Sequence, residues 1–208
     1  VPDEGVAHLA ELADSPARAG NPAEAAAALE RAHALQPENV DVITRLVDLT
    51  GEQGDMERLH RFSLALADAR AREGDLKLAC VILTTLLEKE PGNTETLAQL
   101  ADYAHDAEDE RTETRVLNQL GHKLAKELDY PRAVDVFERL HALRPADADV
   151  LEMLTDCCVA GKMHAKAIGY AVKELELVRA GGNQAAIGKA AAKLLDIDPD
   201  NPSALALL

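Results

Sequence analysis

Four prolines recur along the chain at a constant interval of 54 residues, without an insertion or a deletion. They are Pro37, Pro91, Pro145 and Pro199. Ahead of each proline lies a segment whose apolar side chains are spaced as on one face of a helix. Between Asp129 and Pro145 this segment is long enough for about four turns. Asp129 is suited to capping the start of the predicted helix, and Pro145 to ending it. A fixed period of this size is typical of a protein built from stacked repeats.

Each repeat is predicted to contain three helices, and no stretch alternates for long enough to predict a strand. A first helix is expected at residues 6–18. Three complete sets follow, at 22–36, 40–52 and 56–72; at 75–90, 94–107 and 110–127; and at 130–144, 148–160 and 164–180. We therefore expect about eleven or twelve helices in an all-α, right-handed solenoid of antiparallel helices that covers residues 1–208 as one domain. Its repeats are expected at 1–19 (partial), 20–73, 74–127, 128–181 and 182–208 (partial).

Two of the three helices in each repeat carry a recurring set of small and large apolar residues. In the copy that ends at Pro145 the set is Leu117, Leu120, Gly121, Tyr130, Ala133, Phe137, Leu140 and Pro145. This set resembles the helix pair of the tetratricopeptide repeat (TPR) family. The last copy departs from the pattern, because Leu175 stands where a small residue is expected and Ile187 where Ala is expected. The resemblance implies an α-solenoid that binds peptides or protein surfaces.

The period departs from that family, which repeats two helices in about 34 residues. Here the third helix of each repeat carries Asp48, Asp102 or Asp156 at the same phase, opposite the apolar face. Since Asp is a mediocre helix former, its recurrence indicates that this helix meets the same surroundings in every repeat. Stacking of whole three-helix units, closer to armadillo geometry, would explain this most simply.

Composition restricts the classes of function. The formal net charge of -15 repels phosphate backbones and anionic lipid, so nucleic acid and membrane surfaces are not expected partners. Only 2% of the residues are aromatic and none is Trp, which leaves few large anchors for a deep catalytic cleft. The histidines show no metal-ligand pairing, and no nucleophile motif is present. We therefore predict no enzyme activity, no catalytic residues, no metal and no cofactor.

Three cysteines, Cys80, Cys157 and Cys158, form neither a spaced metal pair nor an even disulfide set, which favours a reducing compartment. Cys158 shares the phase of apolar neighbours and is predicted to be a buried thiol. No apolar run approaches the roughly 20 residues that span a bilayer, and the start lacks a signal peptide. A cytoplasmic protein is the expectation. Because Val1 is not an initiator methionine, the chain is expected to be a fragment or a processed form.

Recurring acidic residues lie on the third helix of each repeat and form the first candidate binding surface. They are Asp41, Asp48, Glu52, Glu95, Asp102, Asp106, Asp149, Glu152 and Asp156. One interpretation is a concave acidic surface that attracts a basic segment of a partner. The other is a solvated face, with acids near the helix N-termini complementing the helix dipole. The second interpretation is favoured, because runs of charged residues usually lie on solvated faces.

A basic strip on the segment 110–127 is the second candidate. It consists of Arg111, Arg115, Asn118, His122 and Lys126, at spacings that follow one side of a helix. It would suit an acidic peptide or a carboxylate, although a solvated face interleaved with glutamates such as Glu110 and Glu113 is again the simpler interpretation.

The sequence as a whole predicts a non-enzymatic scaffold that binds an extended peptide or a partner surface on a curved solenoid. Two alternatives are a regulatory or substrate-recruiting arm of a larger enzyme, and a chaperone that shelters an apolar segment. The partner, the oligomeric state and the choice between the acidic and the basic surface stay open at this stage.

Overall fold

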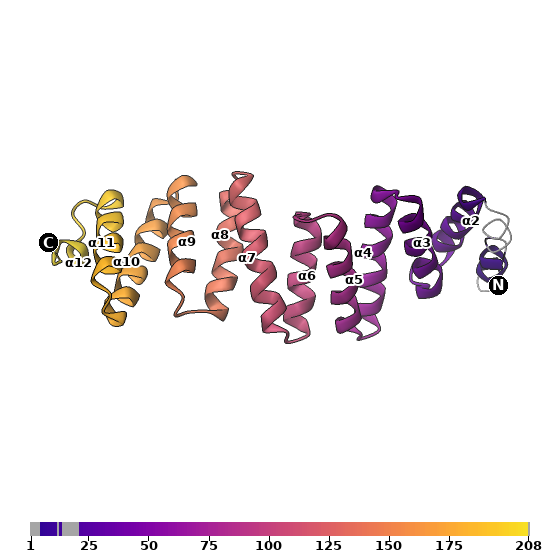
Figure 1. The fold of residues 1–208 in the computed structure, drawn as a ribbon, viewed down its shortest axis with the longest axis horizontal. Helices are drawn as coiled ribbons and strands as arrows, with labels where there is room; N and C mark the ends of the chain where they lie inside the picture. Colours follow the sequence, from indigo (N-terminus) through magenta and orange to yellow (C-terminus); the bar gives the residue numbers. More distant parts are fainter. Residues whose placement is uncertain (1–4, 12, 14–20, 208) are drawn as a thin grey trace. The chain divides into compact units, whose positions relative to one another are not determined.

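A computed structural model describes residues 5–11, 13 and 21–207 of the chain. Within these ranges the regular structure is entirely helical, and no strand is formed (Figure 1). The prediction of an all-α fold is confirmed. Of the helix predicted at 6–18, residues 6–11 and 13 are helical, and its remaining positions lie outside the described residues.

The helix boundaries follow the repeat of the prolines. The helices are α2 (Pro22–Leu35), α3 (Val40–Gln53), α4 (Met56–Arg72), α5 (Leu76–Lys89), α6 (Thr94–Asp106), α7 (Glu110–Lys126), α8 (Tyr130–Leu143), α9 (Ala148–Ala160), α10 (His164–Gly181), α11 (Gln184–Ile197) and α12 (Pro202–Leu205). Each helix from α5 onward begins 54 residues after the helix three places before it. The predicted three helices per repeat are therefore present. The helix predicted at 40–52 extends one residue further, because α3 continues to Gln53 and is followed by the C-cap residue Gly54.

Side chains at repeating positions cap the helices. The carboxamide or carboxylate of Asn39, Asn93, Asp147 and Asn201 accepts a hydrogen bond from a backbone N–H in the first turn of α3, α6, α9 and α12. The prolines at 37, 91, 145 and 199 each follow the C-cap residue of α2, α5, α8 or α11. The prediction that these prolines end helices is confirmed, since a residue before proline is biased away from helical backbone.

Backbone conformation also repeats every 54 residues. A left-handed residue with positive φ follows α3, α6 and α9, at Gly54, Glu108 and Lys162, and another follows α4, α7 and α10, at Gly74, Leu128 and Gly182. Glycine adopts this conformation without strain, whereas an L side chain pays about 1–2 kcal/mol. Leu128 is the least suited of the six, because it is also 68% exposed and gains little from packing.

Replacing Leu128 by glycine is therefore expected to stabilise the protein by about 0.5–1 kcal/mol, the relief of strain being partly offset by the larger entropy of glycine in the unfolded chain. Chemical denaturation measures the change. Leu128→Ala is the matched control, since it removes the exposed side chain but keeps Cβ, and it should not stabilise. A glycine variant less stable than the alanine variant would contradict the explanation.

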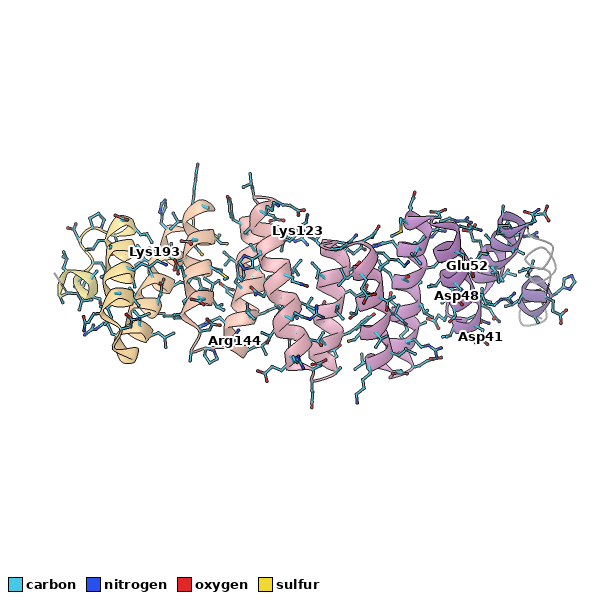
Figure 2. The ribbon with its side chains drawn as sticks, in the orientation of Figure 1. Asp41, Asp48, Glu52, Lys123, Arg144 and Lys193 are labelled. Atoms are coloured by element: carbon cyan, nitrogen blue, oxygen red, sulfur yellow. The ribbon has the colours of Figure 1, made fainter. Side chains whose placement is uncertain are left out.

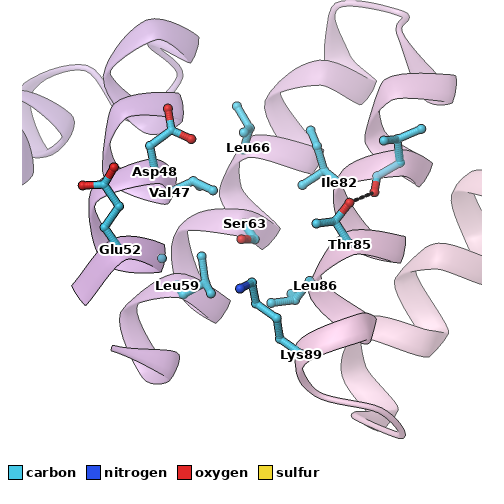
Figure 3. A pocket seen from close by; sticks show the side chains of 12 residues that line it. Val47, Asp48, Glu52, Leu59, Ser63, Leu66, Ile82, Thr85, Leu86 and Lys89 are labelled. Atoms are coloured by element: carbon cyan, nitrogen blue, oxygen red, sulfur yellow. Dashed lines mark hydrogen bonds between the residues drawn. The ribbon is translucent and has the colours of Figure 1, made fainter. Parts of the chain in front are cut away.

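The chain divides into two compact units, Val1–Asp109 and Glu110–Leu208. In the first unit, consecutive helices pack against each other, and side-chain contacts also join alternate helices. Arg58 of α4 donates to Glu30 of α2 at 2.5 Å, and Asp68 of α4 accepts hydrogen bonds from Gln99 and Tyr103 of α6. These contacts place α2, α4 and α6 side by side in one layer. Helices α3 and α5 form the other layer and flank α4 (Figure 3).

The second unit has the same two-layer order. Glu138 of α8 accepts from Lys166 of α10 at 2.8 Å and from Tyr170 of α10 at 2.5 Å. Glu152 of α9 accepts from Lys189 of α11 at 2.6 Å. Helices α8 and α10 thus share one layer, and α9 and α11 share the other.

An odd number of helices in each repeat places equivalent helices in different layers. In the first unit α3 and α6 are equivalent by sequence, yet α6 lies beside α4 whereas α3 lies in the layer of α5. Asp48 and Asp102 therefore do not meet the same surroundings. The interpretation drawn from the recurrence of Asp does not hold within this unit, because periodicity along the sequence carries no information on the layer.

Two core positions of each repeat differ in how they divide large and small side chains between them. Gly121 of α7 lies against Phe137 of α8 so closely that a Cβ on Gly121 would be 2.5 Å from Cε1 of the ring. The equivalent pairs in the preceding repeats combine a small and a medium residue, and all of these side chains are buried: Ala13 with Leu29, and Ala67 with Leu83. In the last repeat the order is reversed, with Leu175 and Ala191 in one core cluster. The departure from the TPR pattern at Leu175 is thus compensated by its partner.

Candidate functional site

A groove in the first unit is formed by three successive helices. It has a volume of about 560 Å³ and is lined by Val47, Asp48, Gly51, Glu52, Leu59, Ser63, Leu66, Val81, Ile82, Thr85, Leu86 and Lys89. Figure 3 shows α4 at its floor, with α3 on one side and α5 on the other. We call this site the α3–α5 groove. The sequence did not predict it.

The floor of the groove is apolar and tightly packed, whereas its walls reach solvent. Leu59, Ser63 and Leu66 of α4 are all buried. The groove is not filled by side chains at two lining positions, because Ser63 on the floor is small and Gly51 on the α3 wall has no side chain. On the α5 wall, Val81 is 59% exposed and lies beside the partly buried Ile82. The groove therefore offers apolar surface that the chain itself does not cover.

Charge is distributed unequally between the two walls. Asp48 and Glu52 lie one helical turn apart on α3, with Asp41 further along the same helix (Figure 2), and all three are exposed. On the opposite wall Lys89 is the charged lining residue. Within the described part of the chain neither Asp48 nor Glu52 forms an ion pair. The α3 wall is thus an acidic edge beside an apolar floor.

The predicted acids of the second unit have a different role. Lys193 of α11 forms an ion pair with Asp156 of α9, with Nζ 2.5 Å from Oδ1, and its Nζ also donates to the backbone carbonyl of Glu152 at 3.3 Å. Lys189 donates to the Glu152 carboxylate, and this hydrogen bond, with both lysine charges nearby, lowers the pKa of Glu152. Two of the nine predicted acids are therefore neutralised within the chain. Asp149 is exposed at the first turn of α9.

The acids on α6 are separated from the groove. Glu95 lies 3.4 Å from Nε2 of His60, whereas Asp102 and Asp106 are exposed on α6. Because α6 belongs to the layer of α4, these three residues do not join Asp48 and Glu52 on one face. The structure brings together only part of the predicted acidic surface.

The basic strip lies along α7 of the second unit. Its five members, Arg111, Arg115, Asn118, His122 and Lys126, are all exposed. The ring of His122 also packs edge-on against Phe137, with ring centroids 5.6 Å apart. Glu113 does not interleave with this strip as expected, because it is buried and pairs with Arg139 of α8 at 3.6 Å. The strip as a binding site stays a prediction.

Several other features bear on chemistry. Cys157 and Cys158 are buried, and burial raises the pKa of the Cys158 thiol to about 11, as expected for a packed thiol that does not react. The prediction of a buried thiol at Cys158 is confirmed. In residues 5–11, 13 and 21–207, no group of three His, Cys, Asp or Glu side chains is arranged to hold a metal ion. None of the helices in these ranges has the length and apolar character needed to cross a bilayer.

Charged residues alone could not predict the groove, because most of its lining is apolar and comes from three helices. The signal that could have identified it is Val81, with Thr85 one turn later, on the polar side of the α5 segment. At the equivalent positions two repeats later the chain has Lys189 and Lys193. With a valine and a threonine in place of two lysines, this face of α5 is uncharged and partly apolar at the positions where α11 is basic.

The stacked antiparallel helices, with small residues at their close contacts, make this chain a helical-repeat protein. No family model and no curated protein matches it. Among solved structures it is similar to the C-terminal part of a TPR repeat-containing protein from Cytophaga hutchinsonii, at 15% identity and a TM-score of 0.31, over 94% of this chain and 98% of that one.

Two further solved structures are similar at the same level. MamA from Desulfovibrio magneticus RS-1 is 16% identical with a TM-score of 0.35, over 98% of this chain and 89% of that one. A signal transduction ATPase with a tetratricopeptide repeat sensor from Pyrococcus horikoshii is 15% identical with a TM-score of 0.41, over 99% of this chain and 38% of that one. With TM-scores below 0.5, these likenesses carry no inference about binding or activity.

Proposed function

We propose that the protein is a non-enzymatic interaction scaffold and that the α3–α5 groove binds a segment of a partner polypeptide. The single observation that carries this proposal is the combination of an apolar floor and an exposed Val81 with an acidic wall whose carboxylates have no partner in the described chain. A single exposed apolar residue is common on protein surfaces, but Val81 borders a contiguous apolar floor, and an exposed patch of this kind is typical of an interaction site.

The shape of the groove favours a polypeptide segment. The floor and the two walls run along three helices, so an elongated ligand can contact all of them. Apolar anchors would cover Val47, Leu66 and Ile82, and the polar edge would fix the orientation of the segment. The rigid helices of the first unit hold the two walls in place, so little ordering of the scaffold opposes binding.

Peptide selection tests the proposal. The intact chain is used to select from a displayed library of random 12-residue peptides, and the selected peptides are then synthesised and titrated against variants. Val81→Ser should weaken binding about tenfold, since loss of about 1.5 kcal/mol of apolar contact corresponds to that factor. The matched control is Leu35→Ser on α2, where an equally exposed apolar side chain (56%) lies outside the groove. If the selected peptides bind both variants equally, or if no peptide is selected, the groove is not the binding site.

A further inference from the structure

The chain contains a second copy of the three helices that form the groove. Helices α9, α10 and α11 each begin 108 residues, or two repeats, after α3, α4 and α5. At this shift Asp48 corresponds to Asp156, and each acid is exposed on its helix. The two copies can therefore be compared position by position, each within its own unit.

In the second copy, two lysines of α11 reach across to the acidic edge of α9. Lys193 has Nζ 2.5 Å from Asp156 Oδ1, and Lys189 has Nζ 2.6 Å from Glu152 Oε1 (Lys193 is labelled in Figure 2). The side chain of Lys193 is only 20% exposed, so its aliphatic part covers the surface between the two helices. An ammonium group on an apolar stem thus completes this copy of the site.

The first copy retains the acid and lacks the lysines. Val81 occupies the position of Lys189, and Thr85 occupies that of Lys193. The Thr85 hydroxyl donates to the backbone carbonyl of Val81 at 3.0 Å and so stays on its own helix. Asp48 is joined by a second carboxylate, Glu52, one turn along α3. Thr44 occupies the position of Glu152, and Glu52 occupies that of Ala160. The second acid of the first copy therefore lies one turn after Asp48 rather than one turn before it. The cation and the covering stem found in the second copy are absent.

We infer that a partner supplies the missing cation and its apolar stem. The α3–α5 groove would then bind a polypeptide segment that carries a lysine or arginine beside apolar residues, with the cationic group between Asp48 and Glu52. This inference rests on the proposed function and specifies its ligand. The apolar stem of the basic residue lies over Val81 and Ile82, where the stem of a native lysine lies in the other copy. Apolar neighbours in the segment fill the floor over Leu59 and Leu66.

The charge of the protein supports a basic ligand. Two carboxylates one turn apart reinforce each other, and the net charge of -15 attracts a cationic segment from solution. Lys89 on the opposite wall sets the orientation, because it would repel a second cation placed at that side.

Two variants test the inference in opposite ways. Asp48→Asn together with Glu52→Gln removes the acidic edge while keeping its shape. Thr85→Lys copies the residue of the second copy into the groove and is expected to pair with Asp48. All three positions are exposed, so neither variant should lower the melting temperature. Peptides selected on the native chain should contain a basic residue at a fixed distance from apolar ones, and both variants should weaken their binding by about tenfold or more.

The control for charge is the same peptide with its basic residue replaced by norleucine, which keeps the apolar stem. This peptide should bind the native chain about tenfold more weakly than the parent, and the Asp48→Asn, Glu52→Gln variant should not weaken it further. Salt should reduce binding of the basic peptide more steeply than binding of the norleucine peptide.

The outcomes separate this inference from the proposed function. Selected peptides that depend on Val81 but carry no basic residue, and bind the Asp48→Asn, Glu52→Gln variant normally, would overturn the inference and leave the groove as a binding site. Peptides that ignore Val81 as well would overturn both. Self-association of the native chain that is abolished by Val81→Ser would identify a second copy of the chain as the occupant and would also overturn the inference.

Discussion

Replacing Ala133 by arginine is expected to lower the free energy of unfolding by about 3–5 kcal/mol, because the new side chain both overfills a packed contact and carries a charge into it. Ala133 on α8 is 0% exposed, and the equivalent Ala25 and Ala79 are also buried. Equilibrium denaturation with urea, followed by circular dichroism, gives the change directly.

The same helix provides a matched control for that experiment. Ala142 lies on α8 but is exposed, so Ala142→Arg introduces the same side chain without burying it and should change stability by less than about 0.5 kcal/mol. Equal stability of the Ala133→Arg variant and the native chain would mean that the repeat register assigned to these alanines is wrong.

Replacing Gly121 by a large residue and Phe137 by a small one is expected to show strong energetic coupling between the two positions. Gly121→Leu alone forces a side chain into the Phe137 ring, and Phe137→Ala alone leaves a cavity that costs about 3–5 kcal/mol. The double variant reproduces the combination that the chain already uses at Leu175 and Ala191. It should therefore recover much of the lost stability, with a coupling energy of about 2 kcal/mol or more.

The four proteins of this double-mutant cycle are compared by denaturant unfolding under identical conditions. A double variant as unstable as the sum of the two single changes would show that the reversed pair at Leu175 and Ala191 depends on other residues around it. Equal slopes of unfolding free energy against denaturant are required, because a changed slope would indicate a different native or denatured state.

The fold could be predicted largely from the sequence because its determinants are local. Pro37, Pro91 and Pro145 act on the residue before them, and caps such as Asn39 act within one helical turn. Local rules of this kind place helix ends to within a few residues without knowledge of tertiary contacts. The left-handed residues at Glu108 and Leu128 were not predicted, since neither is a glycine or an asparagine.

The candidate site was less predictable because it depends on contacts between helices. Asp48 and Asp156 look equivalent along the sequence, yet Asp156 pairs with Lys193 while Asp48 faces Thr85 and Val81 across the groove. A lysine 37 residues away from an acid cannot be assigned to it without knowing which helices share a layer. Burial of Glu113 was missed for the same reason, since its partner Arg139 lies on the next helix.

The odd number of helices in each repeat limits how a stack of this kind can grow. Inserting one 54-residue repeat into a unit would move every later helix of that stack to the opposite layer, and a groove-lining face would become a backing face. Inserting two repeats would restore the original layer and add one more copy of the groove. Recognition surfaces can therefore be duplicated only by pairs of repeats, and a single added or lost repeat changes which face of the scaffold a partner meets.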